Sequence, residues 1–249
     1  MPRDISNHKV NNHSHLNMVT QLIDEAVSNY QLEQFIKNGP FRQFQSVVNK
    51  AGNTNQQFPG NLVLRVLACE VWVKNQRDDE LWYAMGGVPH RFGKEEFALV
   101  SGLWFGEIKK SELDLEKVPL PEGNICLRKW PRKKGAVKAA DIEILINGKN
   151  TKLRCNEEDA KKLVLVDIIQ RLLLGAPNDK CVPRLIWHLV DDLNTFDRFP
   201  WGTYVFSKTL KELSGAIDRR FLDGHRKGTN LRAFGYTFVV WSFEFSYFY

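Results

Sequence analysis

The sequence has few cysteines and none of the close cysteine pairs that mark a zinc site or a disulfide framework. Its four cysteines are Cys69, Cys126, Cys155 and Cys181, and no two of them form a Cys-x-x-Cys pair. This spacing is not that of the usual zinc motifs or of a small disulfide-rich scaffold. We therefore expect four free, buried thiols in a protein that works in a reducing compartment.

Long apolar runs are also missing. No stretch reaches the roughly 18 uncharged apolar residues of a membrane-spanning helix, and the nearest approach, residues 233–243, is followed by Glu244. Residues 1–16 are rich in Asn and His and predict no secretory signal. Glycine-rich loops that bind phosphate or dinucleotides are absent. We expect no cofactor, no small-molecule substrate and no membrane association.

What the sequence does contain is enough apolar material for a large core. Hydrophobic residues make up 43% of the 249 residues, and the chain carries 7 Trp and 16 Phe. This composition is that of a folded protein with a core built largely on aromatic side chains. We predict a flexible segment over residues 1–16 and a single helical domain over residues 17–249.

Apolar residues recur at helical spacing over most of the chain. Helices are predicted over residues 18–36, 41–48, 62–73, 94–103, 156–174, 183–196 and 203–221, and residues 231–249 form a final aromatic segment. The segment 156–174 is apolar on most faces, so we place it near the centre of the fold. Residues 105–140 are polar and proline-containing and are predicted to be irregular.

Two β-hairpins are predicted. The first runs from Leu81 to Phe92 around Gly86-Gly87, with Pro89 placing its second strand at a sheet edge. The second has alternating Ile142, Ile144 and Ile146, then Asn147-Gly148 as a type I′ turn, then a return strand over residues 151–155. The predicted fold class is mostly α (α+β), a helical domain with one or two small hairpins.

The net charge of +6 comes from one segment. Six basic residues and no acidic one lie within residues 128–138, and without them the basic and acidic counts are equal at 29. Clustered cations attract phosphates, and a neighbouring Trp can stack on a base. The segment could be a solvated basic loop, a nuclear-import signal or a nucleic-acid contact. The candidate contact residues are Arg128, Lys129, Trp130, Arg132, Lys133 and Lys134.

No coherent catalytic or metal-binding set is visible. A hydrolase could in principle use Cys181 with His188, and a helix would place His188 beside Asp191 or Asp192. The paired carboxylates at residues 78–80, 95–96, 157–159 and 191–192 are adjacent rather than opposed, which is typical of helix caps and solvated faces. His8, His13 and His15 lack the Cys or carboxylate partners of a metal site.

Three patches resemble a known family. The first is ELWYAMGGVPHRF at residues 80–92, followed by KEEFALVSGL at 94–103; the second is LVDDLNTF at 189–196, running into FPWG at 199–202; the third is FGYTFVVWSFE at 234–244. Together they resemble the plant domain of unknown function found N-terminal to ubiquitin-like (SUMO) protease domains in transposon-derived genes. The resemblance covers about residues 41–244.

The resemblance implies a non-catalytic domain, because the protease chemistry of that family lies in a separate C-terminal domain. It implies an interaction or scaffold role with an unidentified protein partner, in the nucleus or the cytoplasm, with the nucleus favoured. The alternative is a nucleic-acid-binding module that uses segment 128–138. Residues beyond Glu244 depart from the family pattern, so we expect a truncated C-terminus. Phe92, Phe97, Leu99 and Leu103 are expected to be core contacts, and Trp201 a plug at a helical joint.

Overall fold

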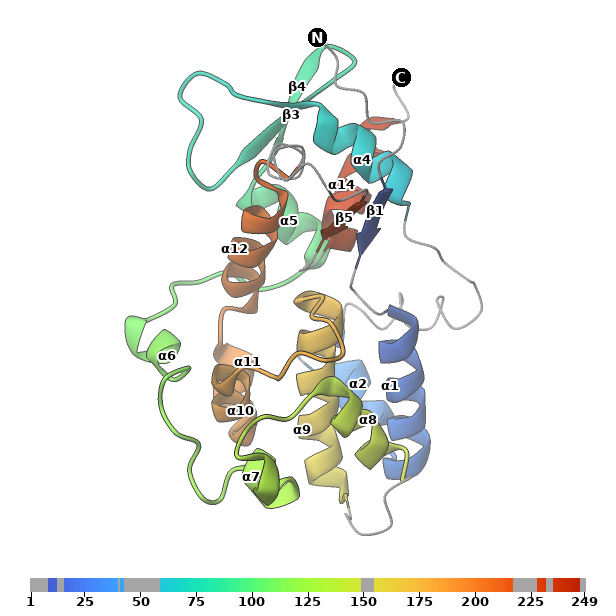
Figure 1. Ribbon diagram of the computed structural model, residues 1–249, viewed down its shortest axis with the longest axis vertical. Coiled ribbons are helices and arrows are strands. Elements are labelled where there is room, and N and C mark those ends of the chain that lie inside the picture. The colour runs from blue at the N-terminus through green and yellow to red at the C-terminus, as the bar shows by residue number, and fades with distance from the viewer. Residues whose placement is uncertain are drawn as a thin grey trace. The chain divides into compact units, whose positions relative to one another are not determined.

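The computed structural model describes residues 9–12, 16–39, 41–42, 59–148, 155–216, 228–231 and 235–246 (Figure 1). The chain divides into two compact units, which are described separately below. Unit 1 comprises Met1–Ser14, Gln56–Phe105 and Trp201–Tyr249, and unit 2 comprises His15–Asn55 and Gly106–Pro200. Helices predominate and are accompanied by short strands, which confirms the mostly α (α+β) class. In the described ranges no helix is long and apolar enough to cross a membrane.

Unit 1 is built around a three-stranded antiparallel sheet in the order β2-β3-β4. Helix α5 packs against both α12 and α14, and α4 packs against α14 and β3. A second, two-stranded sheet pairs β1 with β5 in parallel. The elements are β1 (Lys9–Asn12), α4 (Gly60–Ala68), β2 (Glu70–Val71), β3 (Leu81–Met85), β4 (Val88–Phe92), α5 (Lys94–Ser101), α12 (Trp201–Leu213), β5 (Gly228–Leu231) and α14 (Gly235–Ser246).

The first predicted hairpin is confirmed. Strand β3 pairs with β4 from Leu81 opposite Phe92 to Met85 opposite Val88. Gly86 and Gly87 both have positive φ, +57° and +83°, as a type I′ turn requires. Strand β4 lies at the edge of the sheet, where Pro89 removes one backbone donor from the ladder.

The core of unit 1 is aromatic, as the composition predicts. Neighbouring rings lie 5.1–6.4 Å apart between centroids, and the set consists of Tyr83, Phe92, Phe97, Phe206, Phe238 and Trp241. The expectation that Leu99 joins this core is wrong, because its side chain is 86% exposed. Phe97 and Ser101 form the buried face of α5, and Leu99 lies midway between them on the opposite face.

Unit 2 is helical. Helices α1, α8 and α10 pack on α9, which continues directly into the π-helical turn η3. This places the segment predicted over 156–174 at the centre of its unit. The elements are α1 (Leu16–Tyr30), α2 (Glu33–Asn38), α6 (Lys110–Asp114), α7 (Ile125–Lys129), η2 (Pro131–Lys133), α8 (Ala139–Ile146), α9 (Glu157–Asp167), η3 (Ile168–Leu173), α10 (Arg184–Asp191) and α11 (Leu193–Arg198).

The second predicted hairpin is wrong. Residues 139–146 form α8, whose buried residues Ala139, Ile142, Leu145 and Ile146 recur at helical spacing. Ile144 points away from this face and is 46% exposed. The Asn147-Gly148 pair ends the helix, with Gly148 at a left-handed φ of +64°. The predicted return strand, apart from Cys155, lies outside the described residues.

Two long predicted helices are each broken in two. The helix over residues 18–36 is interrupted at Gln31, whose left-handed φ of +56° separates α1 from α2. The helix over 183–196 is interrupted at Asp192, which is extended and caps α11 through its side chain. Apolar periodicity continues across both breaks, so periodicity alone did not locate them.

Other boundaries also differ from the predictions. The helix predicted over 62–73 ends at Ala68, because Glu70 and Val71 pair with β3 instead. Residues 105–140 contain the short helices α6, α7 and η2. Residues 43–48 and 217–221, both predicted as helix, lie outside the described residues. The assignment of residues 1–16 to a flexible segment and of 17–249 to one domain stays a prediction.

Candidate functional site

Half of the six candidate nucleic-acid contacts form ion pairs within unit 2. Arg128 Nη2 lies 2.9 Å from Asp159 Oδ1, and Lys129 Nζ lies 2.6 Å from Asp159 Oδ2. Burial opposes ionisation of Asp159, but these two cations together hold the pKa of its carboxyl below the ordinary value. Lys133 Nζ lies 2.6 Å from Asp141 Oδ2. These pairs tie the basic segment to α8 and α9.

Trp130, the predicted stacking residue, faces the interior. Its side chain is 7% exposed, and its ring centroid lies 6.2 Å from that of Trp187. A base could not stack on it without opening the unit. Arg132 and Lys134 are exposed and form no ion pair with the described residues. The basic segment therefore offers three exposed cations without an ion pair to the described residues, Arg132, Lys134 and Lys138, but no aromatic platform.

Cys181 and His188 do not form a nucleophile–base pair. The His188 ring contacts the carbonyl oxygen of Val118, with Nε2 at 3.2 Å, and in the described chain Cys181 makes no hydrogen bond to an imidazole. Asp191 accepts from Asn124 and from the backbone of Ile125, so it does not orient His188.

All four cysteines are free, as predicted, but Cys126 alone is fully buried and Cys181 is exposed. Burial raises the pKa of the Cys126 thiol to about 12, so this thiol is not a ready nucleophile. Among the described residues no cluster of three His, Cys, Asp or Glu side chains could hold a metal ion. His8, His13 and His15 lie outside those residues.

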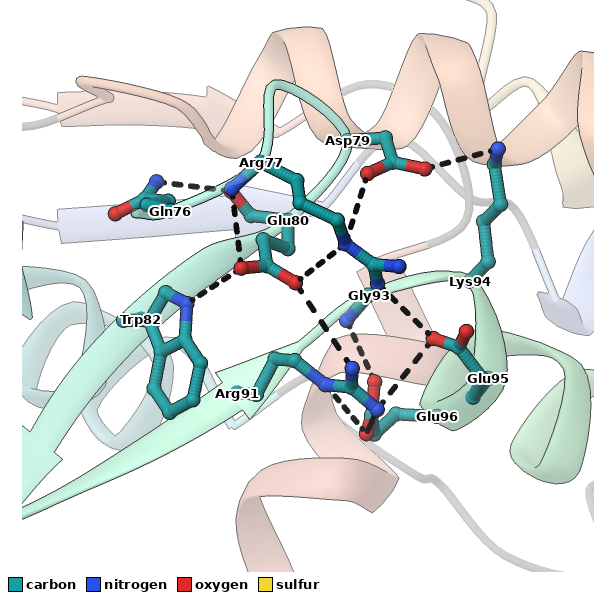
Figure 2. A network of polar contacts seen from close by, with 10 residues as sticks. All are labelled: Gln76, Arg77, Asp79, Glu80, Trp82, Arg91, Gly93, Lys94, Glu95 and Glu96. Carbon is teal, nitrogen blue, oxygen red and sulfur yellow. Dashed lines mark hydrogen bonds and ion pairs between the residues drawn. The ribbon is translucent and has the colours of Figure 1, made fainter. Parts of the chain in front are cut away.

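Two of the carboxylate pairs meet in unit 1, which the sequence did not predict. Figure 2 shows them joined by three cations into one network that links the turn before β3, strand β4 and the start of α5. The charged members are Arg77, Asp79, Glu80, Arg91, Lys94, Glu95 and Glu96. The members come from two segments, residues 77–80 and 91–96, and the β3–β4 hairpin brings these segments together.

Glu80 is the centre of this network and is only 6% exposed. Its carboxylate accepts from Arg77 Nε at 3.1 Å, from the backbone N–H of Arg77 at 3.1 Å and from the indole N–H of Trp82 at 3.1 Å. Burial raises the pKa of Glu80, but the hydrogen bonds from Trp82 and Arg77 together outweigh it and bring the pKa below the ordinary value.

A second centre lies at Arg91. Its Nη2 is 2.9 Å from Glu96 Oε1, and Glu96 Oε2 accepts the backbone N–H of Gly93 at 2.8 Å (Figure 2). Lys94 Nζ lies 2.9 Å from Asp79 Oδ2, and this bond lowers the pKa of Asp79. Every carboxylate of the network already has a cation as its partner. The arrangement therefore holds the backbone in place rather than presenting a general acid or base.

The network fixes one wall of a groove. The groove has a volume of about 470 Å³ and lies between residues 72–81 and the exposed face of α12. Side chains at 207, 210, 211 and 214 share that face at helical spacing. The lining residues are Trp72, Gln76, Arg77, Asp78, Glu80, Leu81, Ser207, Leu210, Lys211 and Ser214.

Trp72 stands at this groove with its side chain 79% exposed. The turn that follows it is closed by Gln76, whose Nε2 donates to the carbonyl oxygen of Glu80 at 2.9 Å. The sequence placed residue 72 on a helix that would run to Val73. This helix prediction is wrong because Glu70 and Val71 pair with β3, and no local sequence pattern indicates that pairing.

The residues that carry the family resemblance are mainly structural. Trp201 is 3% exposed, as expected for a plug, and Gly102 ends α5 with a φ of +63°. No curated protein and no solved structure matches the chain. The model of the family described as domain of unknown function DUF1985 matches residues 71–212, which include the whole charge network and the groove from Trp72 to Lys211. The chain therefore belongs to the DUF1985 family.

Proposed function

We propose that this domain is a non-catalytic protein-interaction module, and that the groove beside Trp72 binds a short peptide segment of a partner protein. The observation that carries the proposal is the 79% exposure of Trp72 on a segment held by the ion pair between Arg77 and the buried Glu80. Large aromatic side chains are costly to leave in water and are enriched at the energetic centres of protein interfaces.

The rigidity of the Trp72 segment supports this role. Gln76 bridges the turn, and Arg77 and Glu80 close it from the other side. Because the segment is already ordered, little conformational entropy is lost when a partner binds. A rigid exposed indole is thus better suited to binding than one on a freely moving loop.

The chemistry of the lining favours a peptide over an apolar small molecule. Ser207, Lys211 and Ser214 on one wall and Asp78 on the other supply donors and acceptors for a polar chain. Leu210, Leu81 and Trp72 supply apolar contact area for one or two side chains. Peptide-binding grooves combine these two features, with backbone hydrogen bonds for affinity and side-chain contacts for specificity.

The cellular setting follows from the family resemblance alone. In a plant protein of this type, the domain would act beside a ubiquitin-like protease domain, in the nucleus or the cytoplasm. Its groove would then select the proteins that reach the protease.

The test is a selection from a library of displayed short random peptides, using the full chain as bait. We expect enrichment of peptides with a shared motif, and loss of at least about tenfold in affinity for the Trp72→Ala variant. Trp104→Ala is the matched control, because Trp104 is 59% exposed in the same unit and does not line the groove. The proposal fails if no motif is enriched, or if selected peptides bind Trp72→Ala as tightly as the unchanged chain.

A further inference from the structure

The centre of unit 2 contains an unusual set of buried polar groups. Asp167 and Arg171 are both 0% exposed, and Gln170 is 1% exposed. They lie where α9 passes into the π turn η3, on a helix otherwise packed with apolar side chains. Buried charges in proteins are normally paired and hydrogen-bonded, so the partners of these groups decide their state.

Those partners are incomplete. Arg171 Nη2 donates to Glu143 Oε2 at 2.8 Å, whereas Arg171 Nε lies 3.4 Å from Asp167 Oδ1 without hydrogen-bond geometry. Both carboxyl oxygens of Asp167 lack a hydrogen-bond partner in the described structure, as do Nε and Nη1 of Arg171. Two carboxyl groups thus compete for one guanidinium, and Glu143 holds the better bond.

Solvent access decides which carboxyl keeps its charge. The side chain of Glu143 is 32% exposed and that of Asp167 is 0% exposed. With both ionised, the three groups carry a net negative charge inside the unit; with Asp167 protonated, they reduce to a neutral Arg171–Glu143 pair. The pKa of Asp167 is raised to about 7, chiefly by burial; Arg171 opposes the rise and Glu143 contributes to it.

Among the described residues the charged groups that act on Asp167 are Arg171 and Glu143; Glu25 of α1 is half-buried, with its Oε2 buried and without a hydrogen-bond partner. Helices α1 and α10 pack on α9, and their described buried side chains are uncharged: Val19, Thr20, Leu22, Ile23 and Ala26 from α1, and Leu185, Ile186, Trp187, Leu189 and Val190 from α10. From α8 the charged group is Glu143.

We propose that Asp167 is a proton-operated switch in unit 2: its neutral form is packed in the interior of the unit, and its ionised form loosens the adjoining π turn. The turn is a natural point of release, because it is closed by two widely spaced turn bonds, from Leu174 N–H to Ile169 O (2.8 Å) and from Ala176 N–H to Gln170 O (2.9 Å). π turns are rare within helices and frequently mark functional positions. The switch is independent of the groove in unit 1.

The sign of the pH effect follows from linkage. The pKa of Asp167 is higher in the folded chain, about 7, than its ordinary value of 3.8. The stabilisation linked to the proton is therefore complete below the ordinary pKa and is lost as the pH rises to about 7. Over that interval the unfolding equilibrium constant should rise about tenfold per pH unit relative to a chain without the group.

The experiment compares urea unfolding of the full chain and of Asp167→Asn between about pH 4.5 and 8.5. We expect the ratio of the two unfolding constants to climb with pH and to level off above about 7. Hydrogen exchange, corrected for intrinsic rates, should show the amides of Leu174 and Ala176 losing protection above pH 7 in the unchanged chain but not in Asp167→Asn. Parallel stability profiles, or equal protection in both chains, would overturn the proposal.

A second variant keeps the test sharp. Glu143→Gln removes the competing carboxylate and leaves Arg171 for Asp167, so the levelling point should move to lower pH. If Asp167→Asn does not fold, the carboxyl carbon of Asp167 is titrated directly by NMR in the unchanged chain and in Glu143→Gln. A midpoint near 4 in the unchanged chain, or the same midpoint in both chains, contradicts the switch.

Discussion

The backbone N–H of Gly202 donates to the carbonyl oxygen of Trp104 at 2.8 Å. A Cβ atom at position 202 would lie 2.5 Å from the Phe105 ring and 2.6 Å from that same carbonyl oxygen. The start of α12 and the segment after α5 therefore approach as closely as two backbones can. The motif residue Gly202 therefore has a packing role.

Gly202→Ala should destabilise the chain by roughly 1–3 kcal/mol or more, because neither the ring nor the carbonyl can retreat without moving a core element. Urea unfolding followed by circular dichroism measures the change. Gly123→Ala is the control: nothing lies within 4 Å of a Cβ at that position, and its effect should stay within about 0.5 kcal/mol. Equal stability of Gly202→Ala and the unchanged chain would show that the joint is loose.

Substitution of Trp130 distinguishes a role of this residue in the core from a role in nucleic-acid binding. Trp130→Ala should cost roughly 3–5 kcal/mol in unfolding free energy, because the indole is 7% exposed and packs on Trp187. Arg132→Ala, at an exposed position, should change it by less than about 0.5 kcal/mol. A Trp130→Ala variant with full stability and lost oligonucleotide binding would instead support the nucleic-acid alternative.

If the chain binds nucleic acid, the exposed cations without an ion pair, Arg132, Lys134 and Lys138, are the candidate phosphate contacts. The double variant Arg132→Ala/Lys134→Ala should then reduce the slope of log K against log salt by about 2, one for each lost phosphate contact. Fluorescence anisotropy with a labelled oligonucleotide at several salt concentrations gives this slope. A double variant of Arg128 and Lys129 would not give a clean test, because both residues pair with Asp159 and their loss would also destabilise α9.

Glu80 should matter most at neutral pH. The pKa of Glu80 in the folded chain lies below its ordinary value of 4.5, so its stabilisation is present above that pH and is lost as the pH falls through the folded pKa. Glu80→Gln should cost about 2 kcal/mol at pH 7, the size of a hydrogen bond to a charged group. The difference from the unchanged chain should shrink at pH 3.

Glu95→Gln is the matched control for Glu80, because its side chain is 55% exposed although it contacts the same two arginines. Surface ion pairs contribute little, so we expect a change below about 0.5 kcal/mol at either pH. Equal losses in both variants would mean that the network acts through its total charge rather than through the buried centre.

The sequence correctly predicted the turns and helix ends that depend on one or two neighbouring residues. Gly86-Gly87 required a tight turn, Gly102 a helix end and Asn156 a helix cap, and all three are found. The charge network was not foreseen, because Asp79 and Glu80 resemble a solvated run until the hairpin carries Arg91 beside them. The groove was missed for the same reason, since its two walls are separated by more than a hundred residues of sequence.

The segment 142–148 shows where a pattern of alternate isoleucines misleads, and it offers a direct test of the helix. In a strand, Ile142, Ile144 and Ile146 would share a buried face; in α8, Leu145 is 2% exposed and Ile144 is 46% exposed. Leu145→Ala should therefore cost roughly 2–5 kcal/mol, and Ile144→Ala should cost less than about 1 kcal/mol. The opposite order would restore the hairpin. Unfolding free energies of the two variants decide between the two structures, because the periods 2.0 and 3.6 place residues 144 and 145 on opposite sides.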